Sequence, residues 1–391
     1  MLTERMTSAI PTIRLKPREG RRLRAGAPWA FSNEVEMSAA TKALKPGAVV
    51  DIQGDDGRVF GTGYFNPNSL IALRLLDPRP GTVPDAAFFA ERLARARSLR
   101  DAVYGKPFYR LVHAEGDFLP GLTIDRFDDV YSVQITTAGM EALRGPLLEA
   151  LGAARVVLRA DAPSRALEGL PSYVEGDVGR IAVEESGVRY FADLTGGQKT
   201  GWYYDQRDNH AFMAALSKDR SVLDAYCYTG GFALAAAKAG AREVIAIDSS
   251  QPALTLAEES AAANGLACKF VKTDVFDEFE RLGHAKETFD VVIADPPPFV
   301  KSRKDLETGA KAYRKLARLA ARLVAPGGFL LLASCSHNIP TERFASECAL
   351  GLQRAERRAR LIRQSGAGAD HPVHPMLPES AYLKTLVYAL D

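Results

Sequence analysis

The hydrophobic and polar positions of the chain change their pattern twice, and each change predicts a new module. Between Ile13 and about Leu76, short apolar runs are broken by turn sequences such as Pro46-Gly47 and Asn66-Pro67-Asn68. Runs with this punctuation predict a small β-rich domain. From Phe88 to Val103, apolar residues recur at helical spacing with arginines between them, which predicts a helix at the start of a second module.

The second module continues with a predicted strand from Val130 to Thr136 and a predicted helix from Met140 to Leu151. After about Val188, strands alternate with helices, beginning with an apolar strand at 222–226 and reaching another at 328–334. Alternation of this kind builds a parallel, doubly wound sheet. The sequence therefore predicts an α/β protein with a β-rich domain at 1–80, an α+β middle domain at 81–187 and a Rossmann-like domain at 188–391.

Composition and charge exclude several classes of protein. The 391 residues, 47% of them hydrophobic and 25% charged, fit a globular chain of two or three domains. No apolar run approaches the roughly 20 residues that a membrane helix needs, so we expect a cytoplasmic protein without a membrane partner. Four scattered cysteines without a C-x-x-C pair indicate reduced thiols and no metal site. Six basic residues between positions 14 and 24 are a candidate phosphate-contacting surface, although charge alone fits a solvated face equally well.

The segment from Asp224 to Phe232 carries the first candidate chemistry. An apolar strand runs there into a loop with two glycines and then into a predicted helix. Ligands of such sheets bind at the carboxyl ends of the strands, where glycine lets the backbone approach them. A dinucleotide site needs G-x-G-x-x-G, and Asp224 would repel a pyrophosphate, which disfavours a NAD-dependent dehydrogenase. A carboxylate at this position suits the cationic amino acid end of S-adenosylmethionine.

Three more aspartates end the next three predicted strands. Asp248 is placed to accept hydrogen bonds from both ribose hydroxyls, and Asp274 to accept one from the adenine amino group. Either residue alone fits a helix cap as well. The ordered series Asp224, Asp248, Asp274 and Asp295 at successive strand ends resembles the class I methyltransferases.

The last two predicted strands end in residues that suit chemistry on a nucleobase. Asp295 is followed by three prolines and Phe299, which offer a carboxylate, rigid backbone carbonyls and a ring for stacking. Cys335 lies in an S-C-S sequence that resembles the T-C-S of RNA cytosine-5 methyltransferases. Pyrimidine C5 is a poor nucleophile, so such enzymes first add a thiolate to C6. The thiolate would need a nearby positive charge or helix N-terminus, and the alternative interpretation of Cys335 is a buried structural residue.

Several segments together resemble the RlmI family of large-subunit ribosomal RNA cytosine-5 methyltransferases. In the C-terminal half these segments are 197–209, 224–232, 295–304, 334–337 and 370–373. At the N-terminus, 26–32 and 61–67 are similar to the PUA domain of that family, an RNA-binding β-barrel. The resemblance covers nearly the whole chain and implies formation of 5-methylcytosine in 23S ribosomal RNA, with S-adenosylmethionine as cofactor.

The resemblance also implies a set of site residues. Cys335 would be the nucleophile, and Asp295 would bind the ring at N3 and the exocyclic amine. The candidate cofactor-binding residues are Lys199, Tyr203, Arg207, Asp224, Tyr226, Tyr228, Thr229, Gly230, Asp248, Ser249, Asp274, Val275 and Asp295. The candidate substrate-binding residues are Pro296, Pro297, Phe299 and Lys301. Prolines 297 and 298 stand where another group of cytosine-5 enzymes carries a second cysteine, so the base that removes the C5 proton is unassigned.

Two other functions remain open at this point. A guanine N7 or exocyclic-amine methyltransferase acting on ribosomal RNA would share the Asp-Pro-Pro strand end and need no nucleophile. A non-catalytic RNA-binding or ribosome-assembly protein would keep the fold alone, because a fold does not fix a function. The modified nucleotide, the choice between naked RNA and an assembling subunit, and the oligomeric state, a homodimer included, are not determined by the sequence.

Overall fold

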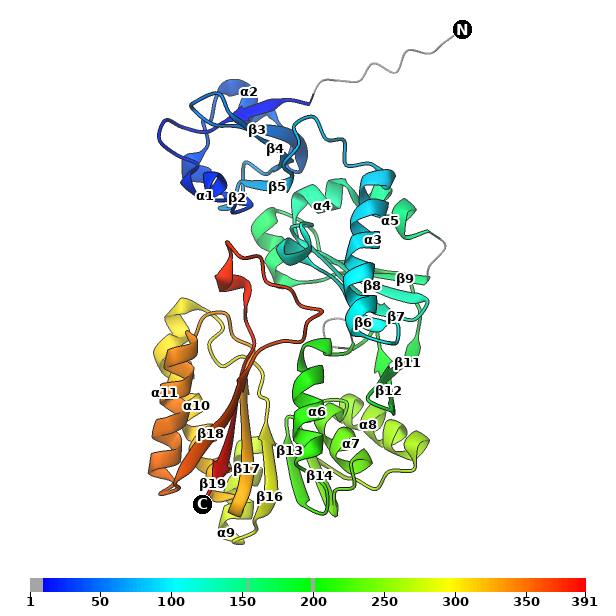
Figure 1. Ribbon diagram of the computed structural model, residues 1–391, viewed down its shortest axis with the longest axis vertical. Helices are drawn as coiled ribbons and strands as arrows, with labels where there is room; N and C mark the ends of the chain where they lie inside the picture. Colours follow the sequence, from blue (N-terminus) through cyan, green and yellow to red (C-terminus); the bar gives the residue numbers. More distant parts are fainter. Residues whose placement is uncertain (1–9, 153–154, 198–200) are drawn as a thin grey trace. The chain divides into compact units, whose positions relative to one another are not determined.

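The computed structural model describes residues 10–152, 155–197 and 201–391 (Figure 1). The chain divides into two compact units, one comprising 1–178 and 369–378 and the other 179–368 and 379–391. Each unit has hydrophobic clusters of its own. In the part of the chain that is described, no helix has the length and apolar character needed to span a bilayer.

The first unit contains two five-stranded sheets, and the N-terminal one has the order β1-β3-β4-β5-β2. Its elements are β1 (Thr12–Arg14), α1 (Arg21–Arg24), β2 (Trp29–Ala30), η1 (Ser32–Glu34), α2 (Ala39–Ala43), β3 (Ala48–Gln53), β4 (Val59–Phe65) and β5 (Leu73–Asp77). Ile52, Phe65 and Leu73 are fully buried between these elements. The short apolar runs of the sequence therefore form the predicted β-rich domain.

The middle sheet has the order β10-β9-β8-β7-β6. Its elements are α3 (Ala86–Val103), β6 (Phe108–His113), η2 (Ala114–Asp117), β7 (Leu122–Phe127), β8 (Val130–Ile135), α4 (Ala138–Ala142), α5 (Arg144–Leu151), β9 (Arg155–Ala160), η3 (Pro163–Glu168) and β10 (Tyr173–Glu175). The single helix predicted from Met140 to Leu151 is wrong, because it is two helices that meet at Leu143. Pro146 has no N–H to bond the carbonyl four residues before it, and proline is tolerated only in a first helical turn.

A buried carboxylate joins the two sheets of the first unit. Glu168 accepts hydrogen bonds from Asn66 Nδ2 at 2.8 Å, Ser69 Oγ at 2.7 Å and Arg74 at 3.1 Å. Burial raises the pKa of Glu168, but these bonds and the Arg74 charge outweigh burial and leave the pKa below its usual value. A chain cut after residue 80 would keep these three donors but lose Glu168, the acceptor that they share, so the β-rich domain is not independent of its neighbour.

The same junction gives a test of packing. A Cβ added to Gly139 in α4 would lie 2.0 Å from the ring of Tyr64, whose hydroxyl donates to the Pro120 carbonyl at 2.8 Å. Gly139→Ala is therefore expected to lower the free energy of unfolding by about 1–3 kcal/mol, because the ring is held at both ends. Urea denaturation followed by circular dichroism measures the change.

Gly145, at the start of α5, is the matched control, since a Cβ there meets no atom within 4 Å. Gly145→Ala is expected to keep or raise stability, by up to about 1 kcal/mol, because alanine is the better helix former. Equal stability of the two variants would show that Tyr64 moves aside without cost.

The second unit is built on a seven-stranded sheet of order β15-β14-β13-β16-β17-β19-β18. Its elements are β11 (Arg180–Glu185), β12 (Val188–Asp193), η4 (Tyr204–Gln206), α6 (Arg207–Ala215), β13 (Ser221–Ala225), α7 (Gly231–Lys238), β14 (Glu243–Asp248), α8 (Gln251–Asn264), β15 (Lys269–Lys272), α9 (Val275–His284), β16 (Phe289–Ala294), η5 (Arg303–Asp305), α10 (Leu306–Arg322), β17 (Val324–Ser334), α11 (Thr341–Arg354), β18 (Ala359–Ser365), η6 (Pro378–Ser380) and β19 (Lys384–Leu390). Strands β13 to β17 pair in parallel, whereas β19 runs antiparallel to both of its neighbours. The predicted doubly wound sheet thus has an antiparallel edge.

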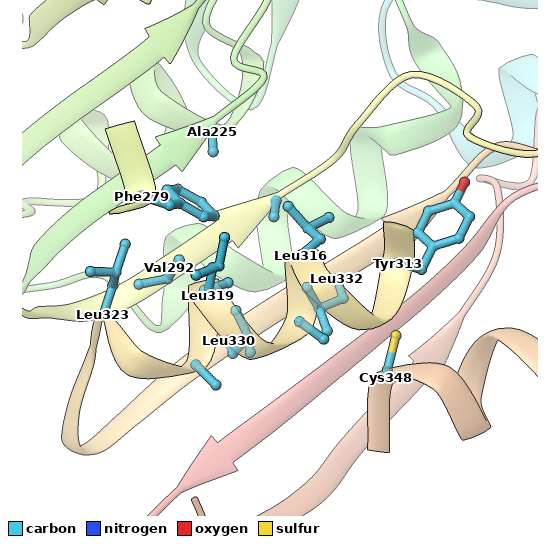
Figure 2. Close-up of a cluster of buried hydrophobic side chains, with 14 of the residues drawn as sticks. Ala225, Phe279, Val292, Tyr313, Leu316, Leu319, Leu323, Leu330, Leu332 and Cys348 are labelled. Atoms are coloured by element: carbon cyan, nitrogen blue, oxygen red, sulfur yellow. The ribbon is translucent and has the colours of Figure 1, made fainter. Parts of the chain in front are cut away.

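Helices cover both faces of this sheet. Along β16, Val292 and Ala294 pack in a cluster with α9 and α10, while Val291 and Ile293 pack in a cluster with α6 and α7. Successive side chains of a strand point to opposite faces, so a strand buried on both faces is apolar throughout. Figure 2 shows the first of these clusters, with Leu316 and Leu319 of α10 among its labelled residues.

Two predicted boundaries need correction. The division at 187/188 cuts the β11–β12 hairpin, which lies wholly in the second unit and turns at Ser186 and Gly187. Both turn residues have positive φ, 49° and 77°, as a two-residue hairpin turn requires. Residues 369–378 belong to the first unit, where the Asp370 carboxylate accepts from the Arg110 amide at 2.9 Å.

Candidate active site

A cavity of about 480 Å³ opens at the carboxyl ends of β13, β14, β16 and β17. Twelve of the predicted site residues line it: Tyr203, Tyr226, Tyr228, Thr229, Asp248, Ser249, Asp274, Asp295, Pro296, Pro297, Phe299 and Cys335. Arg207, Asp224, Gly230, Val275 and Lys301 do not line it, and Lys199 lies outside the described residues. Apart from Asp224, the strand-end residues that the sequence predicts to act together line one cavity.

The loop after β13 has an unusual backbone. Tyr226 and Tyr228 have φ of 63° and 50°, and Gly230, the cap of α7, has φ of 84°. Positive φ is uncommon for residues other than glycine, and such residues concentrate at functional sites. Between them, Thr229 is fully buried, and its Oγ1 has no hydrogen-bond partner among the described residues. A strained loop that holds an unpartnered hydroxyl beside a cavity indicates a ligand-binding segment.

Asp224 lies beneath this loop rather than in the cavity wall. Its side chain is 1% exposed, and Oδ2 accepts from the amide of Ala233 in α7 at 2.9 Å. Burial raises the pKa of Asp224 well above its usual value. Oδ2 fixes the start of α7, whereas Oδ1 is buried without a hydrogen-bond partner among the described residues. The direct contact with a cationic ligand that the sequence suggested therefore stays a prediction.

Asp248 and Asp274 sit at the rim where the sequence placed them. Asp248 accepts from the amides of Tyr228 at 2.9 Å and Ser250 at 2.8 Å, so it ties the strained loop to the end of β14. Asp274 is exposed and caps α9, with Oδ1 accepting from the Phe276 amide at 2.8 Å. The helix-cap and ligand interpretations of Asp274 are therefore compatible, since a carboxylate has two oxygens and about four acceptor positions.

Asp295 is held by a chain of amides that sequence reasoning did not single out. Gln206 Nε2 donates to Asp295 Oδ2 at 2.8 Å, and Asn209 Nδ2 donates to Gln206 Oε1 at 2.7 Å. Asn209 also bonds Thr385 Oγ1 of β19 at 3.2 Å and accepts from Ser365 Oγ at 2.7 Å. These bonds fix the orientation of the carboxylate that faces the cavity. The position of Gln206 inside the segment 197–209 was the one signal available for it.

Aromatic rings and serines surround the end of β17. The rings of Phe299 and Phe276 are stacked, with their centroids 6.0 Å apart. Ser334 Oγ forms a hydrogen bond with the Tyr313 hydroxyl at 2.8 Å. Figure 2 shows Tyr313 at the edge of the apolar cluster. Ser336 Oγ donates to the Val300 carbonyl and accepts from the amide of Asn338. The two serines of S-C-S therefore anchor the loop on both sides of Cys335, which is half-buried and faces the cavity.

Comparison with known proteins gives the fold and the cofactor. A PUA-like domain pattern matches residues 13–78, and an S-adenosylmethionine-dependent methyltransferase pattern matches residues 149–387. A protein of Shewanella denitrificans named ribosomal RNA large subunit methyltransferase I is 37% identical over 96% of this chain and 98% of its own. A protein of Cronobacter sakazakii with the same name is 37% identical over 91% and 93%.

The chain belongs to the ribosomal RNA large subunit methyltransferase I family. It also matches solved structures in fold. A S-adenosylmethionine-dependent methyltransferase from Streptococcus mutans gives a TM-score of 0.80 at 21% identity, over 97% of this chain and 100% of that one. A methyltransferase crystallised with S-adenosylhomocysteine gives 0.82 at 20% identity, with the same coverage. The family, the PUA-like and Rossmann-like domains and the cofactor predicted from the sequence are confirmed.

The cavity of this family member fits S-adenosylmethionine. Its volume of about 480 Å³ lies in the range of small-molecule sites. Carboxylates at the rim and the unpartnered Thr229 hydroxyl supply hydrogen-bond groups for a ligand that carries an amine and hydroxyls. Within the described ranges, no group of three or more His, Cys, Asp or Glu side chains is arranged to hold a metal ion.

Proposed function

We propose that this family member methylates C5 of cytosine in 23S ribosomal RNA, with Cys335 as the nucleophile. The observation that carries the proposal is that Cys335 and Asp295 line the same cavity as the carboxylates at the ends of β14 and β15. A nucleophile, a ring-binding carboxylate and a cofactor pocket thus meet in one space. The names of the curated relatives support ribosomal RNA as the substrate class.

The chemistry assigns one task to each residue. The Cys335 thiolate adds to C6, so that a C6–S bond forms and the electrons of the C5–C6 double bond make C5 nucleophilic. Asp295 binds N3 and the exocyclic amine, which stabilises a proton on N3 during the addition. S-adenosylmethionine, when bound, supplies an electrophilic methyl group. Once C5 carries the methyl group, a base takes the C5 proton. The electrons of that C–H bond re-form the C5–C6 double bond, and cleavage of the C6–S bond releases the thiolate.

The other cavity residues hold the two ligands. Asp248 would receive the ribose hydroxyls, and Asp274 the adenine amine. The Phe299 ring would stack on the target base, with the carbonyls of Pro296 and Pro297 beside it. Four further residues of the cavity wall are proposed to contact the cofactor: Tyr203, Tyr226, Tyr228 and Ser249.

Arg207 acts indirectly in this proposal. Arg207 is the first residue of α6, and its Nε lies 3.5 Å from Glu185 Oε2. Its guanidinium group packs over the Tyr204 ring and so helps to hold η4, which ends at Gln206. Gly230 and Val275 likewise shape the starts of α7 and α9.

RNA binding is assigned to the N-terminal domain. Part of its basic cluster is engaged internally, because Arg24 pairs with Asp55 at 2.7 Å and Lys16 donates to the Asn33 carbonyl at 2.8 Å. Arg21 is exposed on α1, and Arg22 packs over the Phe31 ring. The surface available for phosphates is therefore smaller than six charges suggested, and Arg14, Arg18 and Arg21 are among its exposed members.

The proposal is tested by incubating 23S ribosomal RNA with the enzyme and methyl-labelled S-adenosylmethionine, followed by nucleoside mass spectrometry. Label in 5-methylcytidine is expected. Label in a methylguanosine would remove Cys335 from the chemistry and leave the family and cofactor assignments intact. Binding of the cofactor without transfer to any RNA would favour a ribosome-assembly role.

A further inference from the structure

The environment of Cys335 poses an electrostatic problem. The cavity wall formed by the described residues contains four carboxylates, from Asp205, Asp248, Asp274 and Asp295, and no lysine or arginine. His210 also lines it, and its Nδ1 is engaged by the Glu185 carboxylate at 2.6 Å. Negative charge disfavours the thiolate form of a cysteine, yet the thiolate is the nucleophile. A nucleophilic Cys335 therefore needs a cation that lies behind the cavity wall.

The position of Lys384 makes it the candidate for this cation. It is the first residue of β19 and pairs across the sheet with Ser334, the residue before Cys335. Its side chain is 7% exposed, and Nζ donates to the Ser336 carbonyl at 2.7 Å and the Tyr382 carbonyl at 3.0 Å. The bond to Ser336 holds the ammonium group against the backbone of the S-C-S loop, and the bond to Tyr382 fixes it to its own segment.

Lys384 lacks the partner that a buried ammonium normally has. Within the described ranges, no carboxylate lies within 4.0 Å of its Nζ, although a buried charge is costly unless an opposite charge offsets it. An ammonium has three donors, and the two carbonyls use two of them. Burial lowers the pKa of Lys384, and the adjacent Cys335 raises it, so the thiol and the ammonium group interact electrostatically.

We propose that Lys384 is a positioning residue whose ammonium group stabilises the thiolate of Cys335. The proposal rests on the role of Cys335 proposed above. Other groups that face Cys335 do not supply the charge: Tyr203 precedes η4, Tyr313 lies on α10, and Asp295 ends β16. Burial raises the pKa of Tyr313 to about 12, so this phenol is neutral near pH 7. His337, in the same loop, is exposed and packs on the Tyr382 ring.

The experiment measures thiol reactivity without RNA. Alkylation of Cys335 by iodoacetamide is followed from pH 5 to about 10 by peptide mass spectrometry, because the rate follows the thiolate fraction. Cys268, whose thiol pKa burial raises to about 12, is the internal reference in the same digest. In the unaltered protein the midpoint for Cys335 is expected below the ordinary thiol value of about 8.5. A midpoint at or above that value overturns the proposal without any variant.

Three variants separate charge from packing. Lys384→Gln keeps two N–H donors and removes the charge, so the midpoint is expected to rise by at least about one unit and the rate at pH 7 to fall about tenfold. Lys384→Arg is expected to keep the midpoint low. Lys238→Gln, at the exposed end of α7, removes a distant charge and should change nothing. An unchanged midpoint in a Lys384→Gln protein that still binds S-adenosylmethionine contradicts the proposal.

The outcome is independent of the reaction assigned above. If the product of the enzyme were a methylguanosine, the proposed function would fail while the alkylation profile would still report the effect of Lys384 on Cys335. Conversely, formation of 5-methylcytidine together with a Lys384-independent profile would leave the function standing and remove Lys384 from it.

Discussion

Replacing Cys335 by alanine is expected to reduce methyl transfer to RNA by at least about 10³-fold, because C5 of cytosine stays unreactive without the thiolate adduct. Binding of S-adenosylmethionine should persist, since Cys335 directly follows β17, whereas the carboxylates that we assign to the cofactor are Asp248 at the end of β14 and Asp274 at the start of α9. Methylation kinetics and isothermal titration, run on the same protein, measure the two effects separately.

Cys348→Ala is the matched control for this variant. Cys348 lies on α11, fully buried in the apolar cluster of Figure 2, and has no access to the cavity. Its replacement should cost stability and leave the rate of methyl transfer in the folded protein unchanged. A Cys335→Ala enzyme with nearly the original rate would exclude covalent catalysis.

The second large effect is expected at Asp295. Asp295→Asn keeps the shape of the side chain but removes the negative charge that stabilises a proton on N3 of the base. We expect kcat to fall about 10²- to 10³-fold, the range seen when one group aimed at transition-state charge is lost. Steady-state kinetics with RNA as the varied substrate would show the loss in kcat more than in KM.

Gln206→Leu calibrates the Asp295 result. It leaves the charge in place and removes the hydrogen bond to Asp295 Oδ2 that orients it, so a smaller loss of about tenfold is expected. Asp277→Asn, exposed on α9 and outside the cavity, should have no effect. If Asp295→Asn retained kcat, the carboxylate would have no electrostatic role in the addition step.

The fold was predictable where local pattern and tertiary structure agree. The alternation of strands and helices that became β13 to β17 was identified because each apolar run is short and bounded by turn or cap residues such as Asp274. The helix α9 between β15 and β16 was not predicted. The antiparallel β18 and β19 were not predicted. Their pairing depends on residues far apart in sequence, for example Ser334 with Lys384, and no local pattern encodes such a contact.

The residues of the candidate site were likewise predictable only in part. Residues directly after strands were predicted to meet, because parallel strands end at one edge of a sheet. Gln206 and Leu383, which line the cavity, were missed, and so was Lys384, which bonds the Ser336 carbonyl next to Cys335. A neutral amide and the first residues of a C-terminal strand carry no motif, and a lysine in sequence resembles a surface residue until burial and partners are known.

Between β18 and β19 the chain returns to the first unit, and this path sets the order in which the two units are completed during synthesis. Residues 369–378 close the first unit, where the fully buried Arg100 donates to the Asp370 carbonyl at 2.9 Å. Residues 379–391 then close the second, where β19 brings Lys384 to the S-C-S loop. The first unit lacks contacts until residues 369–378 have left the ribosome, and the second until 379–391 have, so a nascent chain that stalls before β19 lacks a complete active site.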